Sequence, residues 1–491
     1  MEYANDERHV YRLAVVIIFG IIMSILDATI VNVALETLHK DLHTTLAQVQ
    51  WVATGYMLAL AAVIPVSGWM ARRFGDRRIY ITSLILFTCG SILCGASWSI
   101  SSLIAFRVLQ GLGGGMLMPV GTMILARAAG PHRMGRVMSV VGVPMLLAPI
   151  FGPVIGGVLV QHASWRWIFY VNVPIGVIAV TLALLLLHPH STEDAGRLDF
   201  TDLVLLSIGV PALVYGIAEY GEHGQLIARS WITLLVGILA IASFVWHALR
   251  SHHPLLDVRL FRKPAFAAAT ATAFCVGGAL FGSMILLPLF FQNVRLQGAT
   301  QAGVWLIPQG LGAALAMPIA GKLTDKIGGG ILAVFGVCIV LAGTIPLAFI
   351  GAYTPYWVIA ATLAARGIGM GFTMMPVMAT AYALLRPEEI ADATPQLSVI
   401  QQIGGSIGTA TLAVILSRSL TTRLAHATPH ADRLALMAGG YQHAYAFAIF
   451  GIALAILPAI VLYAMERRVR RKAGVVGSAL TPAPAEAEQK H

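Results

Sequence analysis

The long apolar runs of this chain restrict its fold more than any other feature. A helix needs roughly 20 apolar residues to cross the hydrocarbon core of a bilayer, and fourteen such runs follow one another along the 491 residues. Only 11% of the residues are charged, and the mean hydropathy is +0.80. We therefore expect an all-α integral membrane protein with 14 transmembrane helices. The runs lie at about 13–37, 48–70, 79–99, 103–126, 137–160, 167–187, 203–221, 232–249, 266–291, 302–321, 331–351, 355–384, 393–416 and 444–464.

The distribution of positive charge predicts the orientation of these helices. If the N-terminus lies inside, the inner segments carry most of the Lys and Arg residues, including the cluster "ERRVRRK" at 466–472. This asymmetry follows the positive-inside rule and places both termini in the cytoplasm. Because topology explains the net charge of +10, we expect no nucleic-acid partner. The expected location is a cell membrane, with many passes through it.

An internal repeat predicts how the helices are grouped. The stretch "IPVSGWMARRFGDRR" at 64–78 returns as "MPIAGKLTDKIGGG" at 317–330, with its proline and glycines matched at a constant separation of 253 residues. The repeat pairs the second span with the tenth, which is a shift of eight spans. We expect two six-helix halves and an additional, peripheral pair of helices between them. The expected divisions are 1–190 for the N-terminal half, 191–263 for the linker with the additional pair, 264–466 for the C-terminal half, and 467–491 for a basic and then disordered cytoplasmic tail.

Three charged side chains lie deep inside predicted spans: Asp27, Arg107 and Arg366. A charge at that depth costs several kcal/mol unless it is paired. Helix geometry allows Asp27 and Arg107 to reach each other from the first and fourth spans. Asp27 would then exchange a proton when its distance from Arg107 or its access to water changes. The alternative is a static ion pair that only fixes the register of two helices.

Small residues and prolines gather in the fifth span, in the stretch "LAPIFGPVIGG" at 147–157. Such residues permit close contact between helices and a bend where backbone hydrogen bonds are missing. We expect this span to take part in conformational change, and tight packing without motion is the alternative. The residues concerned are Pro149, Gly152, Pro153, Gly156 and Gly157.

Polar side chains inside the spans are candidates for a central substrate cavity. Hydrogen bonding between helices is the alternative role for each of them. No metal, cofactor or catalytic site is predicted: the motif "GGSIG" at 404–408 lacks the preceding strand that a nucleophile elbow needs. We therefore do not expect an enzyme. The cavity candidates are Asn32, Gln50, Tyr56, Gln110, Gln309 and Gln402.

These motifs resemble the major facilitator superfamily, and more closely its fourteen-helix drug:proton antiporter family. The stretch "LDATIVNVAL" is similar to the first-helix motif of that family, "GWMARRFGDRR" to its loop motif, "FRVLQGLGGG" to its fourth-helix motif and "APIFGPVIGG" to its fifth-helix antiporter motif. The segments "SWRWIFYVNVPIG" and "PLLDVRLFR" are further matches. The resemblance implies a major facilitator fold, a location in the bacterial inner membrane, and proton coupling through Asp27 and Arg107. It also implies a conformational role for the loop residues, which are Gly68, Arg72, Gly75, Asp76, Arg77 and, in the second copy, Asp325.

Four positions depart from the pattern of that family. Arg72 stands where the loop motif usually has an acid, and Asp76 stands where it usually has a basic residue. Glu36 replaces a proline that often ends the first-helix motif, and Gln401 replaces an arginine of many relatives. We therefore expect a rewired charge network around the loop.

The predicted function is proton-coupled export, in particular multidrug efflux. Protons would enter while a small amphipathic or lipophilic compound leaves, by alternating access of two halves. One chain is expected to be the transport unit, with its substrate, protons and the lipid bilayer as partners; a periplasmic adaptor and an outer-membrane channel are left open. One alternative is an uncoupled facilitator or importer of a specific metabolite. Another is a membrane sensor or scaffold that transports nothing.

Overall fold

The computed structural model describes residues 7–129, 133–188, 196, 198–251, 254–383, 385–425 and 432–479. The regular structure within these residues is helical. The helices of the first part are α1 Glu7–Asp41, α2 Leu46–Val63, α3 Ser67–Phe74, α4 Asp76–Gly95, α5 Ile100–Ala129, α6 Met134–His162, α7 Trp167–Tyr170, α8 Asn172–Leu186, α9 Phe200–His223 and α10 Ala228–Arg250. Those of the second part are α11 Pro264–Asn293, α12 Ala299–Val304, α13 Ile307–Ile327, α14 Gly329–Thr344, α15 Tyr356–Ala383, α16 Ile390–Ala425 and α17 Arg433–Ala479. Short 3₁₀ turns are η2 Ile64–Val66, η3 Val258–Arg262, η4 Ile345–Phe349 and η5 Pro387–Glu389.

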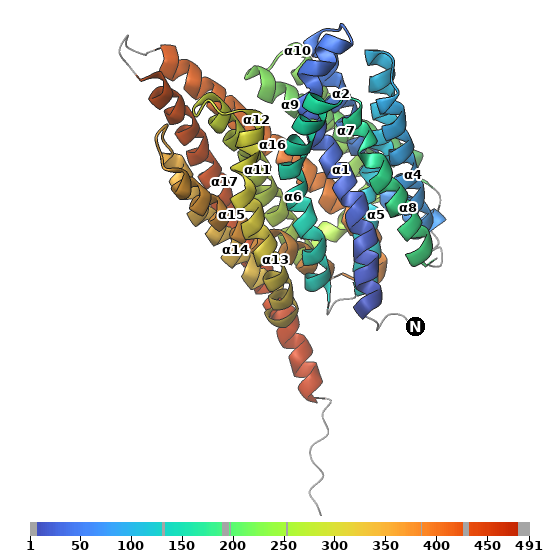
Figure 1. Ribbon diagram of the computed structural model, residues 1–491. Helices are drawn as coiled ribbons and strands as arrows, with labels where there is room; N and C mark the ends of the chain where they lie inside the picture. The colour runs from blue at the N-terminus through green and yellow to red at the C-terminus, as the bar shows by residue number, and fades with distance from the viewer. Residues whose placement is uncertain are drawn as a thin grey trace, which may run out of the picture.

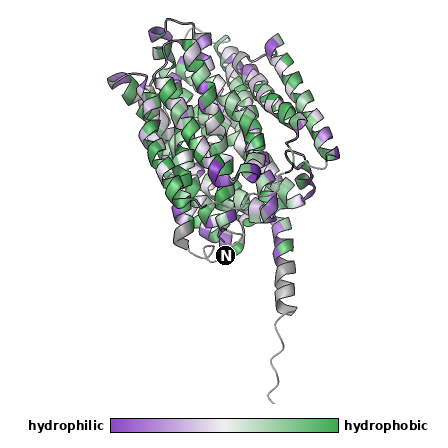
Figure 2. Cartoon of the chain, turned by 90° about the vertical axis from the view of Figure 1, so that its right-hand side faces the viewer, coloured by the Kyte–Doolittle hydropathy of each residue, from purple (hydrophilic) through white to green (hydrophobic). Residues whose placement is uncertain are grey.

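The number of membrane spans agrees with the prediction. Within the described residues, 13 helical segments are long and apolar enough to cross a membrane. A fourteenth span is α6, whose two parts, Met134–Pro149 and Val154–His162, meet at an angle of 44°. Apolar residues dominate the middle of the bundle, and hydrophilic residues gather mainly toward its two ends (Figure 2). The chain is therefore a multi-pass membrane protein.

Prolines explain why several predicted spans are not single regular helices. Proline lacks a backbone N–H and clashes with the preceding turn of a helix. The span predicted at 48–70 consists of α2, η2 and α3, with Pro65 in the 3₁₀ turn. The span predicted at 331–351 consists of α14 and η4, with Pro346 near the start of that turn.

Two sets of helices share one pattern of packing and lie side by side (Figure 1). In the first set, α1–α8, helix α1 packs on α6 and α8, and α5 packs on α2 and α4. In the second set, α11–α17, helix α11 packs on α16 and α17, and α15 packs on α13 and α14. This correspondence is the one that the 253-residue repeat requires. The N-terminus and the end of α17 lie at the same end of the bundle (Figure 1), which we call the inner end.

The additional pair, α9 and α10, was expected to be peripheral, and one of its two helices is not. Helix α10 packs almost entirely on α9 and is peripheral. Helix α9, by contrast, packs on α2 of the first set and on α16 of the second. Its Ser207 donates to the carbonyl of Ala62 at 3.1 Å, and Gly221 lies against the backbone of Ala410. These small residues allow α9 to approach both sets closely, so only α10 is wholly peripheral.

The C-terminal helix continues beyond the predicted end of the second half at Glu466. Helix α17 reaches Ala479, and Arg470 within it contacts the bundle. Arg470 lies 3.2 Å from the carboxylate of Glu466 and donates to the carbonyl of Lys326 at 3.3 Å. Residues 480–491 of the predicted tail and the predicted division at residue 190 lie outside the described residues.

Thiol labelling tests the predicted orientation. In a variant without Cys89, Cys94, Cys275 and Cys338, a cysteine at Arg73 should be protected from a membrane-impermeant reagent added to intact cells. A cysteine at Gln225, between α9 and α10, should react, because that turn is expected to face outward. Inverted membranes should reverse this pattern. Labelling of position 73 in intact cells would contradict the predicted orientation.

Candidate functional site

The carboxylate of Asp27 is the centre of a buried polar cluster in the first set of helices. The residue lies in the middle of α1 and is fully buried. The guanidinium group of Arg107, from α5, forms an ion pair with one carboxylate oxygen. The amide groups of Gln110 and Asn172 each donate to the other oxygen at 2.9 Å. The structure thus brings Asp27 and Arg107 together and adds the donors that a buried charge requires.

Arg107 is itself held from several sides. Its Nε donates to the carbonyl of Val52 at 3.0 Å, and its guanidinium group donates to Oε1 of Gln110 at 2.8 Å. The guanidinium carbon lies 4.1 Å from the centre of the Tyr56 ring, a cation–π contact. The Tyr56 hydroxyl donates to the carbonyl of Ser24 at 3.2 Å. Arg107 therefore connects α1, α2 and α5.

Two members of this cluster, Asn172 and Ser91, were not predicted from the sequence. The amide groups of Asn172 and Gln110 both donate to the Ser91 hydroxyl at 3.0 Å, and this hydroxyl donates to the carbonyl of Phe169 at 3.0 Å. Asn172 lies within the matched segment "SWRWIFYVNVPIG", so a signal for it existed in the sequence. Ser91 had none, because small polar residues are common where membrane helices pack.

Among the side chains of this cluster, Asp27 carries the one carboxyl group, which is an acceptor when ionised and can hold one proton when neutral. Arg107 stays charged, and the amides of Gln110 and Asn172 do not titrate. Protonation of Asp27 would cancel its ion pair with Arg107, so the cluster can exist in two electrostatic states. The arrangement is therefore chemically suited to couple proton uptake to a change in helix packing.

Helix α6 packs on α1 within one turn of Asp27. A Cβ atom added at Gly152 would collide with the side chain of Thr29, and one added at Gly156 would collide with Ile30. The bend of α6 lies between its parts Met134–Pro149 and Val154–His162. The expected close packing and the expected bend are thus both present, and a role in motion stays a prediction. Gly157 is buried as well, whereas the side chain of Pro153, at the bend, lies outside the described part of the structure.

Both copies of the repeated loop motif hold the two sets together at the inner end. A Cβ atom at Gly68 would collide with the carbonyl of Ala391 in α16. A Cβ atom at Gly321 would collide with the side chain of Ser139 and lie 2.7 Å from the carbonyl of Gly135, both in α6. The two contacts are equivalent in the repeat, because in each case the motif of one set meets the fifth span of the other set.

Charged residues of the loop motif reinforce these contacts. Arg72 forms an ion pair with Asp392 of α16 at 2.6 Å. The charge of this arginine is therefore compensated by an acid of the opposite set. In the second copy, the carboxylate of Asp325 accepts a hydrogen bond from the backbone N–H of Gly135 at 2.9 Å. Each copy therefore carries one charged side chain across the interface between the sets.

The remaining loop residues make contacts within the first set. Gly75 has a φ of +88°, a left-handed conformation that favours glycine. Asp76 accepts from the backbone N–H of Arg77 at 2.7 Å and lies 3.8 Å from the guanidinium group of Arg127. The side chain of Arg77 donates to the carbonyl of Leu184 at 2.9 Å. These residues shape the turn between α3 and α4.

The predicted cavity residues are distributed over several environments. Tyr56 and Gln110 belong to the Asp27 cluster. Gln309 lines a cavity of about 20 Å³ between α11, α13 and α15. The other three are exposed or half-buried: Asn32, Gln50 and Gln402.

A cavity of about 30 Å³ lies between the two sets. Its wall comes from α5, α6, α11, α15 and α16 and contains no charged side chain among the described residues. Gln401 is one of its few polar members, with Thr272 and Thr373. Five methionines form much of the remaining wall, and none of them was predicted from the sequence: Met118, Met145, Met374, Met375 and Met378.

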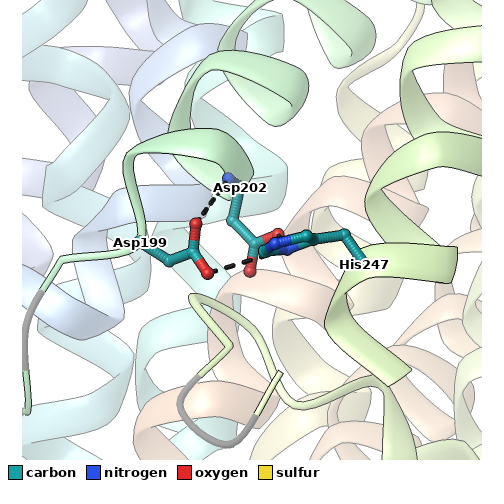
Figure 3. Close-up of side chains that lie close together, drawn as sticks. All are labelled: Asp199, Asp202 and His247. Carbon is teal, nitrogen blue, oxygen red and sulfur yellow. Dashed lines mark hydrogen bonds and ion pairs between the residues drawn. The ribbon is translucent and has the colours of Figure 1, made fainter. Parts of the chain in front are cut away.

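A further polar cluster joins the inner ends of α9 and α10 (Figure 3). Asp199 accepts from the backbone N–H of Thr201 at 3.0 Å and so caps α9. Asp202 lies 2.8 Å from Nδ1 of His247 and accepts from the backbone N–H of Leu255 at 2.9 Å. The three side chains are close enough to hold a metal ion. Their contacts within the protein already satisfy these side chains and connect α9, α10 and the segment that follows α10.

Comparison with known proteins adds to this geometry. The family model described as "Major Facilitator Superfamily" matches residues 17–409. A "Multidrug resistance protein B homolog" of Mycobacterium tuberculosis is 45% identical over 410 residues, which are 83% of this chain and 76% of that protein. The "Lincomycin resistance protein LmrB" of Bacillus subtilis is 28% identical over 94% of this chain and 97% of its own length. The crystal structure of the human organic anion transporter MFSD10 has the same fold, with a TM-score of 0.64 at 12% identity, covering 92% of this chain and 99% of that one.

The ion pair between Arg72 and Asp392 can be tested by charge reversal. In a cysteine-free background, a cysteine replacing buried Ser139 reports opening of the inner end, because it is covered by Gly321. Arg72→Asp or Asp392→Arg alone should raise its labelling about five- to thirtyfold, as expected for roughly 1–2 kcal/mol. The double reversal should restore protection. Reversal of exposed Lys40, which pairs with Glu36 on α1, is the control; equal labelling in all variants would show that the pair does not hold the inner end closed.

Proposed function

Since this chain belongs to the major facilitator superfamily, we propose that it is a proton-coupled exporter of small amphipathic or lipophilic compounds, including drugs. The observation that carries the proposal is the fully buried Asp27 carboxylate and its ion pair with Arg107. The relatives named for multidrug and lincomycin resistance support drug efflux as the physiological role. In this proposal the halves are residues 1–190 and 264–466, and both termini face the cytoplasm.

The coupling step follows from the contacts of Asp27 and α6. When Asp27 takes up a proton, its attraction to Arg107 is lost and its hydrogen bonds with Gln110 and Asn172 rearrange. Helix α6 packs on α1 beside this site and, at its other end, on α13 through Gly135. A change at Asp27 is thereby transmitted to the contact that closes the inner end. The driving force is about 2.3 kcal/mol for each proton per 100 mV, in addition to any pH difference.

The methionine-lined cavity is the proposed site of substrate contact. Methionine side chains are flexible and polarizable and adapt to differently shaped apolar ligands. The absence of charge among the described wall residues favours uncharged compounds, and Gln401 can donate or accept a hydrogen bond. Drug-sized ligands need about 300–1,000 Å³, so this cavity of about 30 Å³ is a closed form that must widen as the sets separate.

An uncoupled facilitator or importer is the main alternative, and a sensor or scaffold is a more distant one. An uncoupled facilitator does not need a titratable carboxyl group beside a permanent cation within the membrane. Burying charged groups there costs several kcal/mol. A sensor gives no reason for reciprocal contacts between two repeated sets of helices at one end. We therefore retain proton-coupled export.

Replacement of Asp27 by asparagine tests the coupling. Asp27→Asn should abolish uphill efflux in proteoliposomes, by at least about a hundredfold as for loss of an essential proton-transfer group, because the amide cannot titrate. Exchange of substrate without a proton gradient should persist, and Asp27→Glu should keep part of the uphill activity. Asp41→Asn, at the exposed end of the same helix, is the matched control. Full gradient-driven efflux by Asp27→Asn would show that the pair with Arg107 is only structural.

Filling the central cavity tests the substrate site. Met378→Trp should occupy the space that a substrate needs and lower efflux by about tenfold or more, which corresponds to roughly 1.4 kcal/mol of lost binding. Met378→Leu keeps the volume and should keep most of the activity. Leu239→Trp, on the exposed face of peripheral α10, controls for added aromatic bulk. If Met378→Trp exported several unrelated compounds at the rate of the wild type, the substrate path would lie elsewhere.

A further inference from the structure

We propose that Arg366, together with the hydroxyl group of Tyr445, binds one small monovalent anion inside the second set of helices. Arg366 lies in the interior of α15 and is 1% exposed. In the part of the chain that the structure describes, it makes no ion pair, and its Nε has no hydrogen-bond partner. The Tyr445 hydroxyl, from α17, is its electrostatic neighbour and is likewise buried without a partner.

The repeat shows which residue of the first set corresponds to Arg366. A Cβ atom at Gly90 would collide with Gln110, and a Cβ atom at Gly343 would collide with Arg366. Gly343 lies 253 residues after Gly90, which is the separation of the repeated loop motif. Arg366 therefore occupies the place of Gln110. In the first set this place adjoins the carboxylate of Asp27, at 2.9 Å.

The two corresponding clusters differ in charge. The first contains an acid and a cation, Asp27 and Arg107, which compensate each other. The second contains a cation and, among the described residues, no acid beside it. An uncompensated charge in such a place is strongly destabilising, as seen when one member of a buried pair is removed. A bound anion would offset this cost in the way that Asp27 does for Arg107.

A small cavity lies beside α15 one helical turn from Arg366, and its described wall includes neither Arg366 nor Tyr445. The cavity of about 20 Å³ is lined by Met370 and Gln309. Met370 lies one helical turn after Arg366 on the same face, and the carbonyl of Gln309 abuts Gly367. A water molecule needs roughly 10–15 Å³ by this kind of measure, so a single small ion or one carboxylate group fits, whereas a whole drug molecule does not. Both chloride and the carboxylate of a transported compound have this chemistry.

Thermal unfolding of the purified full-length protein tests the proposal. Chloride would replace gluconate at a constant ionic strength of about 150 mM, and acetate would replace it in a parallel series. For the wild type we expect chloride or acetate to raise the Tm on the order of 1–3 °C. Arg366→Gln should unfold at a Tm that neither anion changes. Tyr445→Phe should need about fivefold more anion, as for one lost hydrogen bond. Arg250→Gln, at the exposed end of α10, is the control and should respond like the wild type.

The pattern of responses identifies the source of the anion. A shift with chloride supports an inorganic ion, and a shift with acetate alone supports the carboxylate of a substrate. No Arg366-dependent shift with either anion overturns the proposal, as does a shift that persists unchanged in Arg366→Gln. Should Arg366→Gln fail to fold, the comparison of Tyr445→Phe with the wild type decides, because an unchanged anion requirement in that variant also overturns the proposed site.

Discussion

A carboxylate buried in a membrane protein must be surrounded by donors that come from several helices, and Asp27 imposes this requirement on the first set. Its partners Arg107 and Gln110 lie on α5 and Asn172 on α8, while Ser91 of α4 accepts from both amides. These helices can satisfy the charge only if their spacing and rotation are fixed. The cluster therefore constrains the packing of the helices that contribute to it.

Much of this architecture could be predicted from the sequence because it depends on properties of single segments. Apolar length gave the spans, and the depth of two charges gave the pair Asp27 and Arg107. The direction of a side chain around its helix is not fixed by span length, which explains why Tyr56 and Gln110 were assigned to a cavity. Asn172 and the methionine wall were missed for the same reason, since apolar residues carry no signal that separates a cavity wall from a lipid-facing surface.

The repeated frame carries different chemistry in its two copies. Gly90 and Gly343 place a polar side chain at equivalent depths, yet one is the neutral Gln110 and the other the cationic Arg366. The first set therefore pairs its buried cation with an acid, whereas Arg366 of the second set has no described acid beside it.

Helix α6 is the element through which these features act on one another. Its bend separates a part that contacts α13 through Gly135 and Ser139 from a part that contacts α1 through Gly156. Met145, before the bend, lies in the wall of the central cavity. Close-packed contacts of this kind switch between discrete arrangements rather than deform continuously. A bent helix whose parts contact α1 beside Asp27, the cavity wall and the inner closure can therefore link these three places without long-range deformation of the other spans.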